Sequence, residues 1–228
     1  MIDNFCGVGY SNQNYMRLYR SSRFFQFLFQ KSIWRINTSQ KEVYLTFDDG
    51  PTPEVTPFVL EQLRLFNAKA TFFCVGQNVE KHPEIYKSVL NDGHSVGNHT
   101  YSHNSVWKTN LKTWLKDVDT ASALINSSLF RPPYGHLTWM SERKLRSKGL
   151  TPIMWNFITY DFDKTSDPIL AIDLYFKTKK EGSIVVMHDQ PKALPNIKVI
   201  LPELLKRLSK EGFAFKAIPN KKSIDHSK

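Results

Sequence analysis

The regular alternation of strand-type and helix-type segments after residue 41 constrains the fold of this chain more than any other feature. Segments rich in β-branched and aromatic residues alternate with longer segments whose apolar residues recur at helical spacing. The expected strands are 43–47, 71–75, 94–97, 129–130, 152–157, 184–187 and 213–215, and the expected helices are 54–66, 79–90, 110–126, 138–148, 168–180 and 198–210. Strands separated by helices pair in parallel through right-handed crossovers, so the pattern predicts an open doubly wound sheet or a barrel with outer helices.

The same pattern predicts one domain over residues 41–218, preceded by an extension (1–40) that contains a short helix and followed by a basic tail (219–228). A chain of 228 residues fits a single α/β barrel, and we find no internal repeat or linker. Two cysteines are too few for a disulfide scaffold. No apolar run approaches the roughly 20 residues that cross a bilayer.

The net charge of +10 raises the question of a nucleic-acid partner. The charge is concentrated at the two ends, because residues 1–40 carry +4 and residues 216–228 carry +3. The 175 residues between them carry only +3, without a basic stripe. We therefore expect no nucleic-acid binding, since such proteins gather their cations on one face.

The N-terminal extension is basic and aromatic, and its most apolar part is residues 23–31. Gln26 interrupts this run and no small-residue cleavage site follows, so the segment does not meet the pattern of a secretory signal. This predicts a cytoplasmic protein, with a membrane-associated or periplasmic location as the alternative. The extension is expected to form a short helix packed against the domain, or an interfacial helix in which residues 17–35 contact an anionic leaflet.

Polar residues follow five of the expected strands at the point where each strand ends. In a parallel α/β fold, the carboxyl ends of the strands form the ligand site. These segments are Asp48-Asp49-Gly50-Pro51, Asn98-His99-Thr100-Tyr101-Ser102-His103, Arg131-Pro132-Pro133-Tyr134-Gly135, Asp161 and His188-Asp189. Carboxylates, imidazoles and a guanidinium are thus expected at one rim.

Two of these segments have the residue types of a catalytic metal centre. His99 and His103 are four residues apart, which on a helical turn places both imidazoles on one side. Two histidines with a carboxylate as third ligand suit tetrahedral Zn²⁺ with an open position for water. Asp48 and Asp49 are adjacent in an extended segment, so their side chains point apart and can serve different purposes.

In combination and order, these segments resemble the motifs of the polysaccharide deacetylases, the NodB-homology group called carbohydrate esterase family four. Residues 46–51 resemble the first motif of that family, 99–103 the second, 131–135 the third and 184–189 the fifth. The resemblance runs from about residue 43 to residue 215. It implies a distorted (β/α)₇ barrel, in agreement with the seven strands expected above.

The resemblance also implies a metal site and a base. Asp49, His99 and His103 would hold a divalent metal, usually zinc. Asp48 would be the general base that takes a proton from the attacking water. Arg131 would pair with Asp48 and fix its orientation and ionisation.

The other implied roles concern the carbonyl oxygen and the leaving group. The backbone N–H of Tyr134 would help to stabilise the oxyanion. His188 would be the general acid that protonates the departing amine, and Asp161 would orient it. The fourth motif departs from the family pattern, because Phe162 follows Asp161 where the family has tryptophan, and Val186 replaces the usual leucine of the fifth motif. Both changes enlarge a pocket of the kind that receives the acetyl methyl group.

The expected activity is metal-dependent removal of N-acetyl groups from an N-acetylated carbohydrate, with release of acetate, by a monomeric protein. An O-acetyl carbohydrate esterase is an alternative within the same chemistry. A carbohydrate-binding protein with a vestigial site and a charge-driven membrane-surface binder are alternatives from other classes. The sequence does not distinguish among the polysaccharides or glycans that could serve as substrate.

Overall fold

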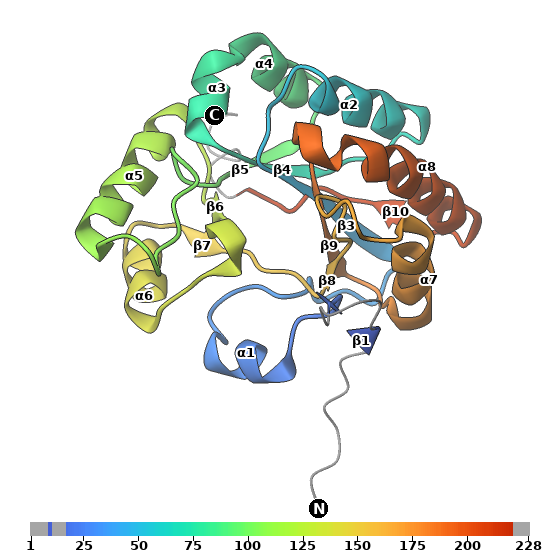
Figure 1. Cartoon of the computed structure of the whole chain (residues 1–228), viewed down its shortest axis with the longest axis horizontal. Coiled ribbons are helices and arrows are strands. Elements are labelled where there is room, and N and C mark those ends of the chain that lie inside the picture. Colours follow the sequence, from blue (N-terminus) through green and yellow to red (C-terminus); the bar gives the residue numbers. More distant parts are fainter. Residues whose placement is uncertain (1–8, 11–16, 221–228) are drawn as a thin grey trace, which may run out of the picture.

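A computed structural model describes residues 9–10 and 17–220 (Figure 1). Its strands are β1 (Gly9–Tyr10), β2 (Arg17–Leu18), β3 (Glu42–Asp48), β4 (Thr71–Cys74), β5 (Ser95–Asn98), β6 (Leu129–Phe130), β7 (Thr151–Pro152), β8 (Phe157–Ile158), β9 (Ser183–His188) and β10 (Ala214–Phe215). Its α-helices are α1 (Arg23–Leu28), α2 (Val55–Leu65), α3 (Gly76–Lys81), α4 (Pro83–Asn91), α5 (Leu111–Leu124), α6 (Trp139–Ser147), α7 (Pro168–Thr178) and α8 (Leu194–Lys210). Helices α2 to α8 surround the strands.

The strands from β3 onward form one parallel sheet in the order β7-β6-β5-β4-β3-β9-β8, with β10 paired to β3. Parallel pairing follows from the helical crossovers and confirms the expectation from the sequence. The pairing of β3 with β9 runs from Val43 opposite Ser183 to Asp48 opposite His188. These two strands therefore end side by side, which places Asp48 next to His188.

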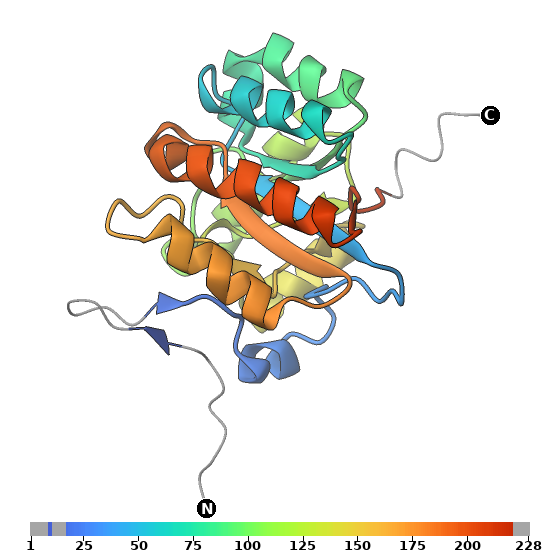
Figure 2. The same ribbon diagram turned by 90° about the vertical axis from the view of Figure 1, so that its right-hand side faces the viewer.

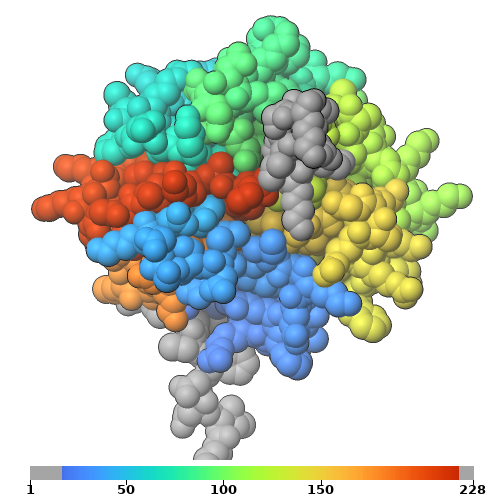
Figure 3. Space-filling view, turned by 180° about the vertical axis from the view of Figure 1, so that it is seen from behind, coloured from blue at the N-terminus to red at the C-terminus, as the bar shows by residue number. Residues whose placement is uncertain are grey.

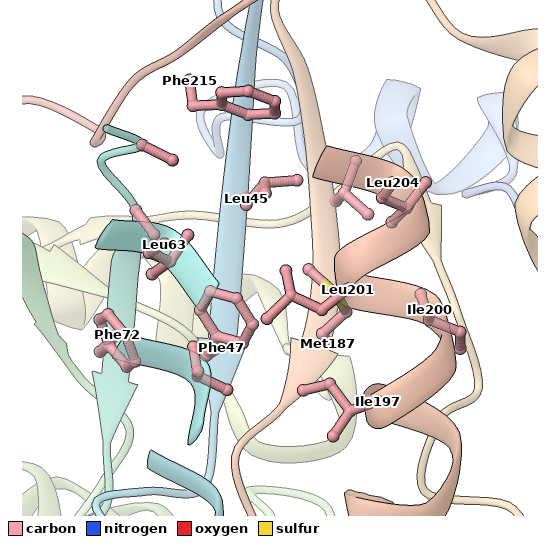
Figure 4. Packing of buried hydrophobic residues seen from close by; sticks show 14 of the residues in the cluster. Leu45, Phe47, Leu63, Phe72, Met187, Ile197, Ile200, Leu201, Leu204 and Phe215 are labelled. Carbon is pink, nitrogen blue, oxygen red and sulfur yellow. The ribbon is translucent and has the colours of Figure 1, made fainter. Parts of the chain in front are cut away.

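The core lies on the outer face of the central strands, between them and helices α2 and α8. Phe47 and Met187 project from β3 and β9, and both are fully buried (Figure 4). Leu201 of α8 and Leu63 of α2 contribute to the same cluster. The apolar residues of both helices recur at helical spacing, so one stripe of each helix packs on the sheet. This packing fixes the strands whose ends carry the site.

The expected strand 152–157 is wrong, because the structure divides it into β7 and β8. The two short strands lie at opposite edges of the sheet and do not pair with each other. Residues 153–156 cross from one edge to the other, and we call the gap between the two edges the seam. A continuous apolar run does not show whether a strand stays in one sheet position. The division gives the parallel sheet eight strands rather than the seven expected.

The extension before β3 packs along this seam. Ile33 pairs with Ile153 and Arg20 pairs with Phe157, so the extension contacts both edges of the sheet. Tyr19 is buried against Phe157. The extension also contains the expected short helix, α1, which lies on the outside of the molecule between α6 and α7 (Figure 1). The division of the chain at residues 40 and 218 remains a prediction, and most of the basic tail (219–228) lies outside the described residues.

The expected helix 79–90 is also two helices, because α3 ends before Pro83 and α4 begins there. Proline has no N–H and is favoured at the first position of a helix. Helix α8 begins four residues earlier than expected. None of the helices in the described ranges is long and apolar enough to cross a bilayer.

Candidate active site

The structure brings the expected site residues together at the carboxyl ends of neighbouring strands. Asp48 ends β3, and Asp49 directly follows it. The remaining residues follow β5, β6 and β8 or end β9; they are His99, His103, Arg131, Tyr134, Asp161 and His188. Every one of these strands belongs to the same parallel sheet, so its carboxyl ends face one rim.

Asp49, His99 and His103 form a compact set of donor atoms. Oδ1 of Asp49 lies 3.0 Å from Nε2 of His103 and 3.4 Å from Nε2 of His99. All three donor atoms lie within 4.8 Å of one another, and they form the one cluster of this kind found among the described residues. Ligands of a tetrahedral zinc ion, each about 2.0–2.1 Å from the metal, are separated by similar distances.

The hydrogen bonding of His99 shows that this set fits a cation. Nδ1 of His99 lies 2.7 Å from the carbonyl oxygen of Arg131, which can only accept, so Nδ1 carries the hydrogen. In the neutral ring, Nε2 then presents a lone pair toward Asp49. Oδ1 of Asp49 is buried and accepts no well-directed hydrogen bond from any described residue. A lone pair and a carboxylate oxygen face each other without repulsion only when a positive charge, either a metal ion or a proton, lies between them. A carbonyl partner on the second ring nitrogen is also typical of metal-binding histidines.

The second carboxylate oxygen of Asp49 is held by Gln190. Nε2 of Gln190 donates a hydrogen bond of 2.6 Å to Oδ2 of Asp49, and Nδ2 of Asn78 donates one of 2.7 Å to the Asp49 carbonyl. Burial raises the pKa of Asp49, but the adjacent His103 and His99 outweigh burial and hold it well below its usual range. Asp49 is therefore ionised and fixed in orientation.

The helical turn expected for His99–His103 is wrong, because these residues form an irregular loop. Thr100 and His103 have positive φ angles of 65° and 56°, which only left-handed backbone conformations show. Asp117 of α5 stabilises the loop, since its Oδ2 accepts hydrogen bonds from the backbone N–H groups of Tyr101 and Ser102. The two imidazoles thus converge through a strained loop rather than through helical periodicity.

Asp48 and Arg131 form a buried ion pair beside the donor set. Nη1 of Arg131 donates hydrogen bonds of 2.7 Å to Oδ1 of Asp48 and to Oγ1 of Thr46. Nε and Nη2 donate to the carbonyl oxygens of Ile153 and Met154, so the guanidinium is bonded on every side. The fully buried guanidinium therefore holds Asp48 in one position.

His188 and Asp161 form a second charged pair. Nδ1 of His188 lies 2.8 Å from Oδ1 of Asp161, and the backbone N–H of His188 donates to Oδ2 at 2.7 Å. Burial lowers the pKa of His188, but Asp161 outweighs burial, and the more distant Asp49 and Asp48 add to its effect. The net result raises the pKa to about 9. The ring of Phe162 packs edge-on against His188 with a centroid distance of 4.7 Å.

Aromatic side chains surround the exposed side of the donor set. The ring of Tyr134, which has a positive φ of 61°, lies 4.7 Å from the ring of His103 and is largely exposed. Trp107 stacks on His136 with a centroid distance of 3.7 Å and an angle of 8° between the rings. The exposed face of this stack, next to Tyr134, is suited to contact with the face of a sugar ring.

The sequence analysis missed the supporting role of Asp189. Its Oδ1 accepts a hydrogen bond from the backbone N–H of Gly50, and its Oδ2 accepts one from Oγ1 of Thr56. A Cβ at position 50 would overlap this carboxylate, so the loop after Asp49 requires glycine. The signal that could have identified Asp189 is its position directly after His188, beside the end of β3.

Comparisons with known proteins agree with the arrangement of the site. Residues 35–153 match the family model described as "Polysaccharide deacetylase". A peptidoglycan-N-acetylglucosamine deacetylase of Bacillus cereus is 31% identical over 189 residues, which cover 80% of this chain and 68% of the relative. A chitooligosaccharide deacetylase of Azorhizobium caulinodans is 29% identical, over 81% of this chain and 96% of the relative.

Solved structures give the same result for the fold. The crystal structure of a peptidoglycan N-acetylglucosamine deacetylase superposes with a TM-score of 0.77 and 28% identity, covering 86% of this chain and 94% of that one. A CE4 family pseudoenzyme from Bacillus anthracis superposes with a TM-score of 0.71 and 25% identity, over 82% and 67% of the two chains. The expected distorted (β/α)₇ barrel is confirmed. Because one neighbour is a pseudoenzyme, activity must be argued from the site residues.

Proposed function

Since the chain belongs to the polysaccharide deacetylase family and is a hydrolase of non-peptide carbon–nitrogen bonds, we propose that it removes N-acetyl groups from an N-acetylglucosamine-type polymer or glycan. One observation carries the proposal. Two carboxylates, a guanidinium, two imidazoles and an acid–base pair from five separate strand ends meet at one rim, with complementary hydrogen bonds. A vestigial site would be expected to lack one of these groups.

We propose that Asp49, His99 and His103 hold a divalent metal, with zinc as the expected ion. When bound, such an ion would supply Lewis-acid chemistry, polarising the acetyl carbonyl and lowering the pKa of a nearby water toward about 7. The donor set fits this purpose because it consists of two histidines and one carboxylate, which leaves a tetrahedral ion one open position.

Asp48 is the general base of the proposed mechanism. Its Oδ1 is bonded to Arg131, so its other oxygen can accept a proton from the attacking water. The guanidinium holds the carboxylate in a fixed orientation. The water attacks the carbonyl carbon, the C–O bond forms, and the proton passes to Asp48.

His188 is the proposed general acid. Its Nδ1 faces Asp161, so Nε2 is the atom that can donate a proton to the departing nitrogen. An amine cannot leave as an anion, so a positioned acid is required when the C–N bond breaks. An alkoxide has less need of an acid, and the strongly supported imidazolium therefore favours the amide over the O-acetyl ester as substrate. The backbone N–H of Tyr134 is the proposed donor to the oxyanion.

The substrate class follows from the relatives and from the surface beside the site. The relatives named above act on peptidoglycan or chitooligosaccharides. The exposed Trp107–His136 stack and Tyr134 offer flat apolar surfaces to a sugar ring. We propose that the protein acts as a monomer. A peptidoglycan substrate would place it outside the cytoplasmic membrane, and a soluble glycan would fit the cytoplasm.

Acetate release from a panel of N-acetylglucosamine oligomers tests the proposed function. The purified protein should release acetate, lose this activity with a chelator, and recover it when zinc is added. An Asp48→Asn variant should remain inactive after zinc addition. Release from O-acetylated xylan without release from the oligomers would instead support the esterase, and binding of the oligomers without release of acetate would support a vestigial site.

A further inference from the structure

The extension holds helix α1 in a fixed position on the outer wall of the barrel. Before the helix, the carbonyl oxygen of buried Tyr19 accepts a hydrogen bond of 2.9 Å from the backbone N–H of Ile158. After the helix, Oγ of Ser32 donates one of 2.6 Å to Oε1 of Glu142 on α6. Both ends are therefore anchored, and α1 projects from the body of the molecule (Figure 2).

The helix turns its apolar side away from the protein. Gln26 is the one uncharged polar residue of the helix. Its Nε2 donates a hydrogen bond of 2.8 Å to Oγ of Ser21. The apolar residues are exposed to solvent. The exposed fraction is 62% for Phe24 and 70% for Phe27, and none of the helix residues is buried. A helix that packs on its own core shows the opposite arrangement.

The exposed apolar residues share one side of α1. At about 100° per residue, Phe27, Phe24, Leu28 and Phe25 span an arc of about 160°, and Gln26 lies outside it. We call these four residues the α1 apolar face. Aromatic residues gathered on one exposed face mark an interaction surface rather than ordinary scattered exposure.

The segment of chain that carries the α1 apolar face is basic. Residues 17–41 contain six cations and no acidic residue. Arg17 is paired with Asp163, but Arg23, Lys31 and Arg35 are exposed and form no ion pair with a described residue. The blue surface in Figure 3 shows this segment between α6 and α7. A second copy of the chain would bring like charges together across this face, whereas an anionic surface would neutralise them.

We propose that the α1 apolar face docks on an anionic lipid bilayer, with Arg23, Lys31 and Arg35 contacting the lipid phosphates. The phenyl rings of the face enter the boundary between headgroups and acyl chains, and the cations remain at headgroup level. Because α1 lies on the outer wall, not at the strand ends that carry the site, docking leaves the rim open to carbohydrate.

Co-sedimentation of the full-length chain with lipid vesicles tests this proposal. The chain should sediment with vesicles of phosphatidylcholine and phosphatidylglycerol in equal parts, should not sediment with phosphatidylcholine alone, and should be released by salt. Replacing Arg23 and Lys31 by glutamine should weaken partitioning by about 30-fold. The pair Phe24→Ser and Phe27→Ser should weaken it by on the order of 100-fold.

Matched substitutions on the opposite helices serve as controls. Leu65→Ser on α2 removes an equally exposed apolar residue, and Lys206→Gln with Lys210→Gln on α8 removes two exposed cations. These variants should partition like the wild type. All variants should release acetate from soluble oligomers at the wild-type rate, which separates this proposal from the proposed function.

The proposal is overturned if the chain does not sediment with anionic vesicles. It is equally overturned if the control variants lose partitioning to the same extent as the α1 variants. It is also overturned if sedimentation velocity shows a lipid-free dimer that becomes monomeric in the Phe24→Ser, Phe27→Ser variant. That result would assign the face to a second copy of the chain.

Discussion

Replacing Asp161 by asparagine should convert His188 from a protonated to a largely neutral imidazole near neutral pH. Asparagine keeps the size of the side chain but removes the charge that lies 2.8 Å from Nδ1 of His188. It also cannot accept hydrogen bonds at both terminal atoms, as Asp161 does from the ring and the backbone N–H of His188. Burial, which lowers the pKa of a histidine, would then be opposed only by more distant carboxylates.

The size of the effect follows from the raised pKa of His188. Its ordinary value of 6.5 is raised to about 9 in the folded protein, against the effect of burial. A loss of about two pKa units corresponds to roughly 3 kcal/mol. At a pH of about 7.5, the protonated fraction would fall from nearly all molecules to about one quarter, and kcat would fall about fourfold with it.

The pH dependence of kcat for acetate release measures this change. As the proposed general acid, His188 must be protonated, so activity should be present below its pKa and should be lost as the pH rises through it. The alkaline limb is the pH range in which kcat falls as the pH rises. In the wild type it should lie at or somewhat below pH 9, because a cation bound to Asp49 would cancel the contribution of that carboxylate to the raised pKa of His188. In Asp161→Asn the limb should move about two pH units lower.

Asp163→Asn is the matched control, since Asp163 lies in the same loop but pairs with Arg17. Its alkaline limb should coincide with that of the wild type, and all three proteins should contain the same amount of metal. An Asp161→Asn variant that kept the wild-type limb and the wild-type kcat would refute the reasoning.

Four further substitutions test other parts of the site. His99→Ala should lose both bound metal and activity, whereas His188→Ala should lose activity but keep its metal; equal metal loss by elemental analysis would contradict the assignment. Arg131→Met should lower the free energy of unfolding by at least about 3 kcal/mol in urea denaturation, because it leaves Asp48 buried without its partner; an unchanged midpoint would show that the pair contributes little. Gly50→Ala should lower both stability and kcat, because the new Cβ would overlap the carboxylate at position 189, and a fully active, equally stable variant would contradict that role.

Much of the fold could be predicted because strand–helix alternation and parallel pairing are local and topological properties. The short strand β6 and the strands β3, β4 and β9 lie where the sequence predicts them. The crossing of the seam by residues 153–156 could not be predicted, because an apolar run gives no information on sheet position. The sequence left the orientation of α1 open between a helix packed on the domain and an interfacial helix, since a helical apolar arc does not show whether it faces core or solvent.

The residue types of the site could be predicted, but their supports could not. Polar residues at strand ends identify Asp49 and His99 because parallel strands bring their carboxyl ends together. The left-handed backbone at His103 and the hydrogen bonds that Asp117 accepts from the loop depend on tertiary contacts between residues separated in the sequence. Gln190 looks like an ordinary loop residue until its contact with Asp49 is seen.

The most direct test of the metal centre is anomalous diffraction at the zinc edge from crystals of the full-length chain grown with zinc. The structure predicts one dominant peak within about 2.0–2.2 Å of Nε2 of His99, Nε2 of His103 and a carboxylate oxygen of Asp49. A crystal without a peak at these three atoms, or with its strongest peak elsewhere on the chain, would contradict the assignment of this rim as the catalytic centre.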